Sequence, residues 1–174
     1  VTIDEWRETF PEIPGVATPR EPASLRRLDF GPEAESGILS QQPPRIANTR
    51  GYTILVPAVD TDGNDVAGIR APMVQAPLAT YTGWNIRARG HGEGATHEFT
   101  GSTIPLPETA SMREATGDPR AAILERYQNS DAYRQAIIAA AEQLENDGFM
   151  LSEDVERATR DAEDWDRNRH SITL

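Results

Sequence analysis

The sequence contains no cysteine and no lysine, and each absence excludes a class of chemistry. Without cysteine, the chain has no disulfides, no thiolate metal sites and no cysteine nucleophile. All 17 basic residues are arginines, against 28 acidic residues, so the net charge is −11. Because nucleic acids and anionic membranes attract clustered positive charge, the composition argues against either as a partner. No apolar run approaches the roughly 18 residues of a membrane span.

The start of the chain is also uninformative about its compartment. It opens on Val1 and carries no basic segment followed by an apolar one. We therefore expect that sequence upstream of Val1 is missing, and the localisation stays open.

Glycine and proline, 13 of each, favour many loops around a modest core, since only 37% of residues are hydrophobic. The predicted fold class is α+β: a β-hairpin and short strands followed by C-terminal helices. We divide this single structural unit into three regions. They are an N-terminal short helix with a proline-rich wrapping segment (1–50), a β-hairpin and signature region with a glycine-rich loop (51–107), and a C-terminal helical region (108–174).

Local patterns place the elements of the first two regions. Thr2 and Glu5 have the spacing of a capping box, which predicts a helix over residues 2–9. The prolines that follow predict a long loop with one short strand. Further on, the sequence predicts a strand at 52–59, a hairpin turn at 62–64, an extended piece at 73–80 and a mobile loop at 88–105.

The third region has helical periodicity. Gly117 is expected to end one helix, while Asp118 and Pro119 have the residue types that cap and begin another. A longer helix is predicted from Ser130 to about Asp147. Its apolar stripe contains Tyr133, Ile137, Ala140 or Ala141, and Leu144. Gly148 fits the position after it, and Ser152 begins a last, amphipathic helix with Val155, Ala158, Ala162 and Trp165 on one face.

No complete catalytic set occurs in the sequence. A serine hydrolase of the α/β type needs Gly-x-Ser-x-Gly, which is absent, and Ser102 is expected to lie in a turn. His91 and His97 are six residues apart, which is not the spacing of a helical zinc pair. A surface loop is favoured for both, although a general-base role for His91 near a cleft stays open. Asp60 to Asn64 lacks the glycine and glutamate positions of a calcium loop, so we predict a turn, no metal and no cofactor.

The densest polar and aromatic cluster lies between residues 70 and 87. Aromatic rings with one polar end suit either a ligand-binding cleft or a junction between domains. The junction is favoured, and two arginines in the cluster could hold a buried carboxylate. The candidate residues are Arg70, Tyr81, Trp84, Asn85 and Arg87.

The stretch DGNDVAGIRAPMVQAPLATYTGWNIR, residues 62–87, resembles the C-terminal signature of the large bacterial "α/β hydrolase domain" proteins, a family of serine hydrolases. The resemblance extends over nearly the whole chain. It includes, in order, PEIPGV at 11–16, LDFGP at 28–32, GSTIPLP at 101–107, GDPR-x-x-ILERY at 117–127 and LSEDV at 151–155.

This resemblance implies that the chain is the last part of such a hydrolase and part of a larger α/β-hydrolase fold. The family's members are several times longer, and their nucleophile lies before the matched stretch, so no catalytic residue can be assigned here. The implied function is hydrolysis of a carboxylic ester or related acyl bond, with the remainder of the hydrolase, in the same polypeptide or an associated chain, as partner. The alternative is a stand-alone, non-enzymatic binding or scaffolding module.

Overall fold

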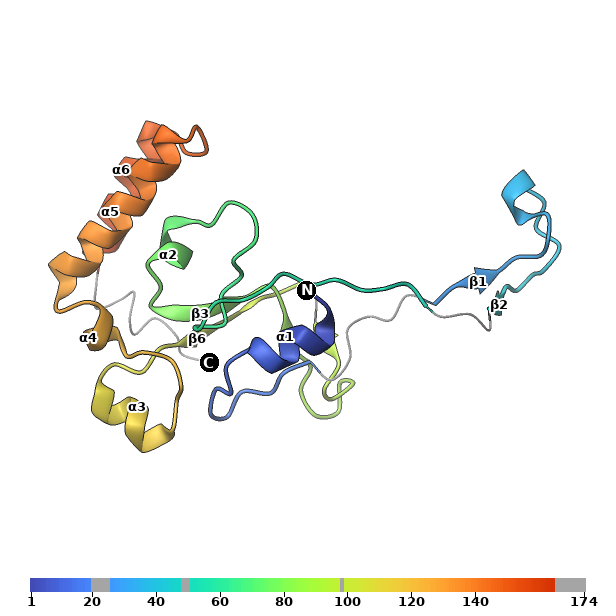
Figure 1. Ribbon diagram of the computed structural model, residues 1–174, viewed down its shortest axis with the longest axis horizontal. Helices are drawn as coiled ribbons and strands as arrows, with labels where there is room; N and C mark the ends of the chain where they lie inside the picture. Colours follow the sequence, from blue (N-terminus) through green and yellow to red (C-terminus); the bar gives the residue numbers. More distant parts are fainter. Residues whose placement is uncertain (20–25, 48–50, 98, 165–174) are drawn as a thin grey trace.

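The computed structural model describes residues 1–19, 26–47, 51–97 and 99–164. Figure 1 shows an elongated arrangement, with the two longest helices at one end, a small hairpin at the other and the central strands between them. The helices are α1 (Ile3–Thr9), α2 (Pro72–Gln75), α3 (Ala110–Thr116), α4 (Ile123–Arg126), α5 (Ser130–Asn146), α6 (Ser152–Glu163) and the 3₁₀ helix η1 (Ala34–Ser36). The strands are β1 (Leu28–Asp29), β2 (Arg45–Ile46), β3 (Ala79–Thr82), β4 (Asn85–Ile86), β5 (Thr96–His97) and β6 (Ser102–Pro105).

The strands form three antiparallel pairs, β1–β2, β3–β6 and β4–β5. In the longest pair, Ala79 lies opposite Pro105 and Thr82 opposite Ser102. Short antiparallel strands together with helices make a mixed α+β structure, which confirms the predicted fold class. The ladder joins segments about twenty residues apart in the sequence.

Helix α1 begins where the sequence predicts. The Thr2 side chain accepts a hydrogen bond from the Glu5 N–H, and the Glu5 carboxylate accepts from the Thr2 N–H at 2.7 Å. This pair satisfies two N–H groups that a helix start would leave without partners. The helix buries Trp6. The Trp6 side chain forms a hydrophobic cluster with Phe10 and Ile13, and Trp84 and Ile104 pack against this cluster.

The helical end of the molecule has its own core. Asn129 caps α5, whose predicted stripe is buried: Tyr133, Ile137, Ala140, Ala141 and Leu144. Gly148 follows with a φ of 78°, as expected for the residue after a helix end. Helix α6 begins at Ser152 and buries Ala162 in the same cluster as Leu78, Leu106 and Ile123. The predicted position of Trp165 lies outside the described residues.

Several local predictions were wrong. Residues 52–59 form only isolated bridges at Leu55 and Val59 rather than a strand. The extended piece at 73–80 is instead the short helix α2 followed by the first residues of β3. The loop 88–105 contains β5 and β6, because its last residues pair with β3. Asp118 does not cap a helix, since α4 begins at Ile123.

The segment around β1, η1 and β2 forms a small hairpin that lies apart from the other elements (Figure 1). It holds two short strands where the sequence predicted one, with Leu28 opposite Ile46. Its large apolar side chains are mostly exposed: Leu28, Ile38, Leu39 and Ile46. We call residues 26–47 the arm.

Candidate functional site

Residues 60–64 form a tight turn held by the side chain of Asp60. Its Oδ1 accepts hydrogen bonds from the backbone N–H groups of Asp62 and Asn64, both at 3.0 Å, and its Oδ2 binds Arg70 Nη2 at 2.7 Å. Gly63 sits in the left-handed region with a φ of +80°, and a Cβ there would lie 2.9 Å from the Phe10 ring. The turn therefore requires glycine for both conformation and space.

Asn64 and Thr80, both with 0% exposure, join this turn to strand β3. The Asn64 amide donates to the Ala79 carbonyl at 3.1 Å, and its Oδ1 accepts from the Tyr81 N–H at 2.7 Å. The Thr80 hydroxyl donates to the Asp62 carbonyl. Since buried polar groups are costly without partners, these bonds fix the turn against the strand.

Arg120, only 2% exposed, is the centre of the buried polar network. Its guanidinium makes a bidentate pair with Asp118, at 3.0 Å from Nε and 2.6 Å from Nη2. The remaining N–H groups donate to the Thr80 hydroxyl at 2.8 Å and to the carbonyls of Ile104 and Pro105 at 3.0 and 2.8 Å. Arg120 thus connects both central strands with the loop before α4.

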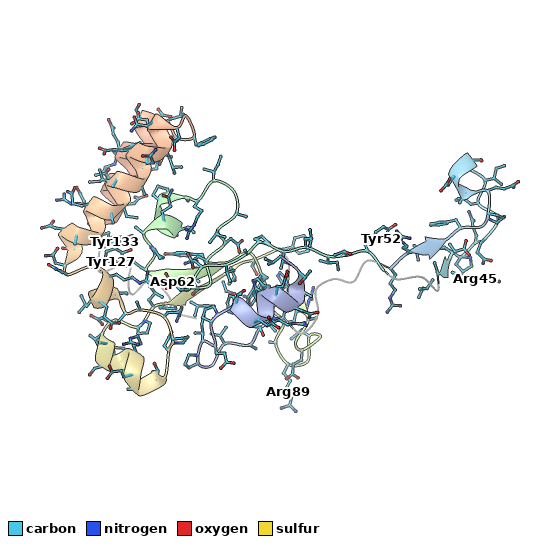
Figure 2. The ribbon with its side chains drawn as sticks, in the orientation of Figure 1. Arg45, Tyr52, Asp62, Arg89, Tyr127 and Tyr133 are labelled. Atoms are coloured by element: carbon cyan, nitrogen blue, oxygen red, sulfur yellow. The ribbon has the colours of Figure 1, made fainter. Side chains whose placement is uncertain are left out.

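Two more charges complete this network. Arg126 of α4 forms an ion pair with Asp62, a buried carboxylate that Figure 2 shows beside the central strands. Burial opposes ionisation of Asp118, but its hydrogen bonds to Arg120 and the charge of Arg120 outweigh this and lower the pKa of the carboxyl. Because every charge here faces an opposite charge, the network is suited to holding elements together rather than to proton transfer.

A separate pocket of about 340 Å³ opens beside α1 and the end of β3. One wall is made of three aromatic rings in mutual contact, with centroids 4.6 Å apart for Trp6 and Phe10, 6.0 Å for Trp6 and Trp84, and 5.9 Å for Phe10 and Trp84. Ile3, Val56, Pro57 and Val59 add aliphatic surface, and Asp65, Thr82 and Thr96 supply polar groups. This volume and the mostly apolar lining are comparable to those of small-molecule sites.

The predicted cluster does not form one site. Arg70 binds Asp60 and the Val74 carbonyl, and Tyr81 is half-buried in β3. Trp84 belongs to the aromatic wall of the pocket. Asn85 is exposed in β4 opposite His97, and Arg87 is exposed just after that strand.

The residues weighed for catalysis make other contacts. His91 is exposed in the turn between β4 and β5, and its backbone N–H donates to the Ala88 carbonyl at 3.1 Å. The His97 ring lies 3.2 Å from the Thr100 hydroxyl. Ser102 begins strand β6 rather than lying in a turn, and its hydroxyl donates to the Trp84 carbonyl at 3.1 Å. Among the described residues, no hydrogen bond joins a serine hydroxyl to a histidine ring.

Sequence reasoning missed the buried charges. Asp62 and Asn64 were recognised only as turn residues, and Arg120 only as part of the GDPR stretch. The one available signal was that Gly117 to Arg120 places an aspartate and an arginine two residues apart, a spacing that allows the observed bidentate pair. Nothing in the local sequence indicated that the pair would be buried.

We expect alkaline pH to unfold the protein through its buried tyrosines. Figure 2 shows Tyr127 and Tyr133 side by side, and burial raises the pKa of Tyr127 from 10.0 to about 12. Burial also raises the pKa of Tyr133 and of Tyr81. Because the unfolded state ionises first, the stabilisation is complete below about pH 10 and is lost as the pH rises toward about 12.

Circular dichroism and tyrosinate absorbance, followed together against pH, check this expectation. The buried tyrosines should ionise only as the helical signal is lost, and Tyr127→Phe should shift the alkaline transition to higher pH. Ionisation of all tyrosines near pH 10 in a protein that keeps its native spectrum would contradict it.

Within 1–19, 26–47, 51–97 and 99–164, no group of three or more histidine, aspartate or glutamate side chains is arranged to hold a metal ion. In the same part of the chain, no helix has the length and hydropathy needed to cross a membrane.

Comparison with known proteins identifies the family. The sequence model of the family described as "Alpha/beta hydrolase domain" matches residues 16–160, which is most of the chain. Searches of curated proteins and of solved structures found no match. The matched range contains the arm, the central strands, the buried charge network and most of α6. The resemblance indicated by residues 62–87 is therefore confirmed, and the chain belongs to the alpha/beta hydrolase domain family.

Proposed function

We propose that this chain is the C-terminal part of a serine hydrolase that acts on carboxylic esters, and that it completes the fold while the nucleophile comes from residues outside it. The observation that carries the proposal is the family match over residues 16–160, in a chain whose sequence has no Gly-x-Ser-x-Gly. Acyl transfer by a serine requires a base beside the hydroxyl and donors for the oxyanion. Ser102 is unsuited to this role because its hydroxyl is bound to a backbone carbonyl.

The proposed partner is the remainder of the hydrolase, in the same polypeptide or in an associated chain. The arm supports this part of the proposal. A lone two-stranded hairpin is marginally stable in water, and this one exposes 50% of Leu28 and 56% of Ile46. A protein surface that covers these side chains would stabilise the hairpin by removing apolar area from water.

The candidate residues between 70 and 91 fit a junction with that partner better than a catalytic centre. Arg70 and Tyr81 support the turn and β3, and Trp84 lines the pocket. Asn85, Arg87 and the loop with His91 are exposed on the same β4–β5 hairpin, so they are available either to contact the rest of the hydrolase or to border its cleft.

Labelling with a fluorophosphonate probe tests the proposal. The native protein that carries this chain should be modified on a serine outside the 174 residues, as located by peptide mass spectrometry. The 174-residue chain alone should neither react with the probe nor hydrolyse p-nitrophenyl esters above the buffer rate. Labelling of Ser102 that is lost in Ser102→Ala, or ester hydrolysis that survives this substitution, would show that the active site is misplaced.

The second candidate is a stand-alone binding module. It is favoured by the pocket beside Trp84, which could take a ligand without any nucleophile. Intact mass separates the two candidates: a native polypeptide that is longer and labelled elsewhere supports the hydrolase. A native polypeptide that begins near Val1, folds alone and is not labelled supports the binding module.

A further inference from the structure

We propose that the pocket beside α1 is a binding site for an uncharged aromatic group of a small molecule, such as a phenyl or naphthyl ring. The inference concerns binding alone, and it holds whether or not the chain belongs to a functioning esterase. It rests on the shape of the pocket, its aromatic wall and the sign of its charge.

The aromatic wall favours a ring as ligand. Trp6, Phe10 and Trp84 contact one another in tilted and edge-to-face arrangements and line the pocket, where Trp84 is half-buried and the other two rings are nearly buried. A planar ring can pack on such a wall in the offset or edge-on geometry that aromatic pairs prefer. The volume of about 340 Å³ falls in the range of small-molecule pockets.

The same wall argues against a cationic ligand. An ammonium group held by cation–π contacts lies over an exposed ring face, usually between rings that surround it. Here the centroids of Trp6 and Phe10 are only 4.6 Å apart, so each ring covers one face of the other and an ammonium group has no room between them.

The polar groups of the pocket argue against an anion. Asp65 is the one charged residue among those lining the pocket, all of which belong to the described part of the chain. Its carboxyl faces Arg70 and Asp60 as charged neighbours, and burial together with Asp60 raises its pKa despite Arg70. Thr82 offers little to an anion, because its hydroxyl already donates to the Trp84 carbonyl at 2.6 Å.

Gly83 provides a direct way to fill the pocket. It lies at the rim, its φ is outside the left-handed region, and a Cβ built there meets no atom within 4 Å. Gly83→Phe therefore adds a phenyl ring at a residue that lines the pocket, without forcing the backbone. Ala88→Phe is the matched control, because it adds the same ring at an exposed position that does not line the pocket.

Isothermal titration of the native protein that carries this chain, with three probes of similar shape, tests the inference. The probes are 2-naphthol, 2-naphthoate and 2-naphthylmethylammonium. We expect 2-naphthol to bind with one-to-one stoichiometry, at least about tenfold more tightly than either charged probe. Gly83→Phe should weaken its binding by about tenfold or more, and Ala88→Phe should leave it unchanged.

Three results would overturn the proposal. They are no binding of 2-naphthol by the wild-type chain, tighter binding of a charged probe, or equal binding by Gly83→Phe with an unchanged circular dichroism spectrum. If Gly83→Phe does not fold, Thr96→Phe adds a ring to the same pocket from β5. Unchanged binding of 2-naphthol by the Thr96→Phe variant would then overturn the proposal.

Discussion

Replacing Arg120 by methionine is expected to destabilise the protein by about 3–5 kcal/mol, the cost of leaving a buried charge without its partner. The substitution removes five side-chain hydrogen bonds and leaves Asp118 buried beside an apolar chain. Since domains of this size are stable by about 5–15 kcal/mol, much of the population should unfold under mild denaturant. Urea unfolding followed by circular dichroism measures the change.

Arg157→Met is the matched control. Arg157 pairs with Asp154 at 2.7 Å on the exposed face of α6, and exposed pairs of this kind contribute about 0–1 kcal/mol. The double variant Asp118→Asn with Arg120→Met should recover part of the loss, because it also removes the buried charge. Equal destabilisation by Arg120→Met and Arg157→Met would refute the central role given to Arg120.

Asn64→Leu is expected to cost about 2–4 kcal/mol, because it leaves the Ala79 carbonyl and the Tyr81 N–H without their partners. The two side chains have the same branched shape and the same number of non-hydrogen atoms, so the effect reports the lost hydrogen bonds rather than a cavity. Thermal or urea unfolding measures it, and a loss below about 0.5 kcal/mol, typical of surface changes, would contradict the assignment.

Asn64→Asp separates the two hydrogen bonds. The introduced carboxylate keeps the acceptor for the Tyr81 N–H but has no donor for the Ala79 carbonyl, and it lies near Asp60 and Asp62. Burial and these like charges should raise its pKa, so its protonated form, which can donate, gains population in the folded state as the pH falls. The difference in stability from the wild type should therefore shrink at acid pH.

Elements set by local chemistry were predictable from the sequence. Helix α1 follows from its capping box, and α5 follows from its stripe and from Gly148. The hairpin turn at 62–64 follows from its residue types, because few residues adopt the required backbone. Each of these signals lies within a few residues of the element that it specifies.

The strand pairing and the charge network were not predictable in this way. The β3–β6 ladder pairs Thr80 with Ile104, and the hydroxyl of Thr80 contacts Arg120 forty residues later. Such contacts depend on how distant segments meet, and one sequence carries no record of that. The same limit explains why the cluster from Arg70 to Arg87, adjacent in sequence, is divided between the turn, the strand and the pocket.

The side chain of Asn64 also bears on self-association. The Leu78 carbonyl accepts from the Leu106 N–H, just after β6, so Ala79 and Tyr81 direct their backbone groups to the opposite edge of β3, where Asn64 occupies them. An open edge is a template on which a second molecule can add a strand. Asn64 occupies two backbone groups of this edge with a single amide, so less of the edge is open to a second strand.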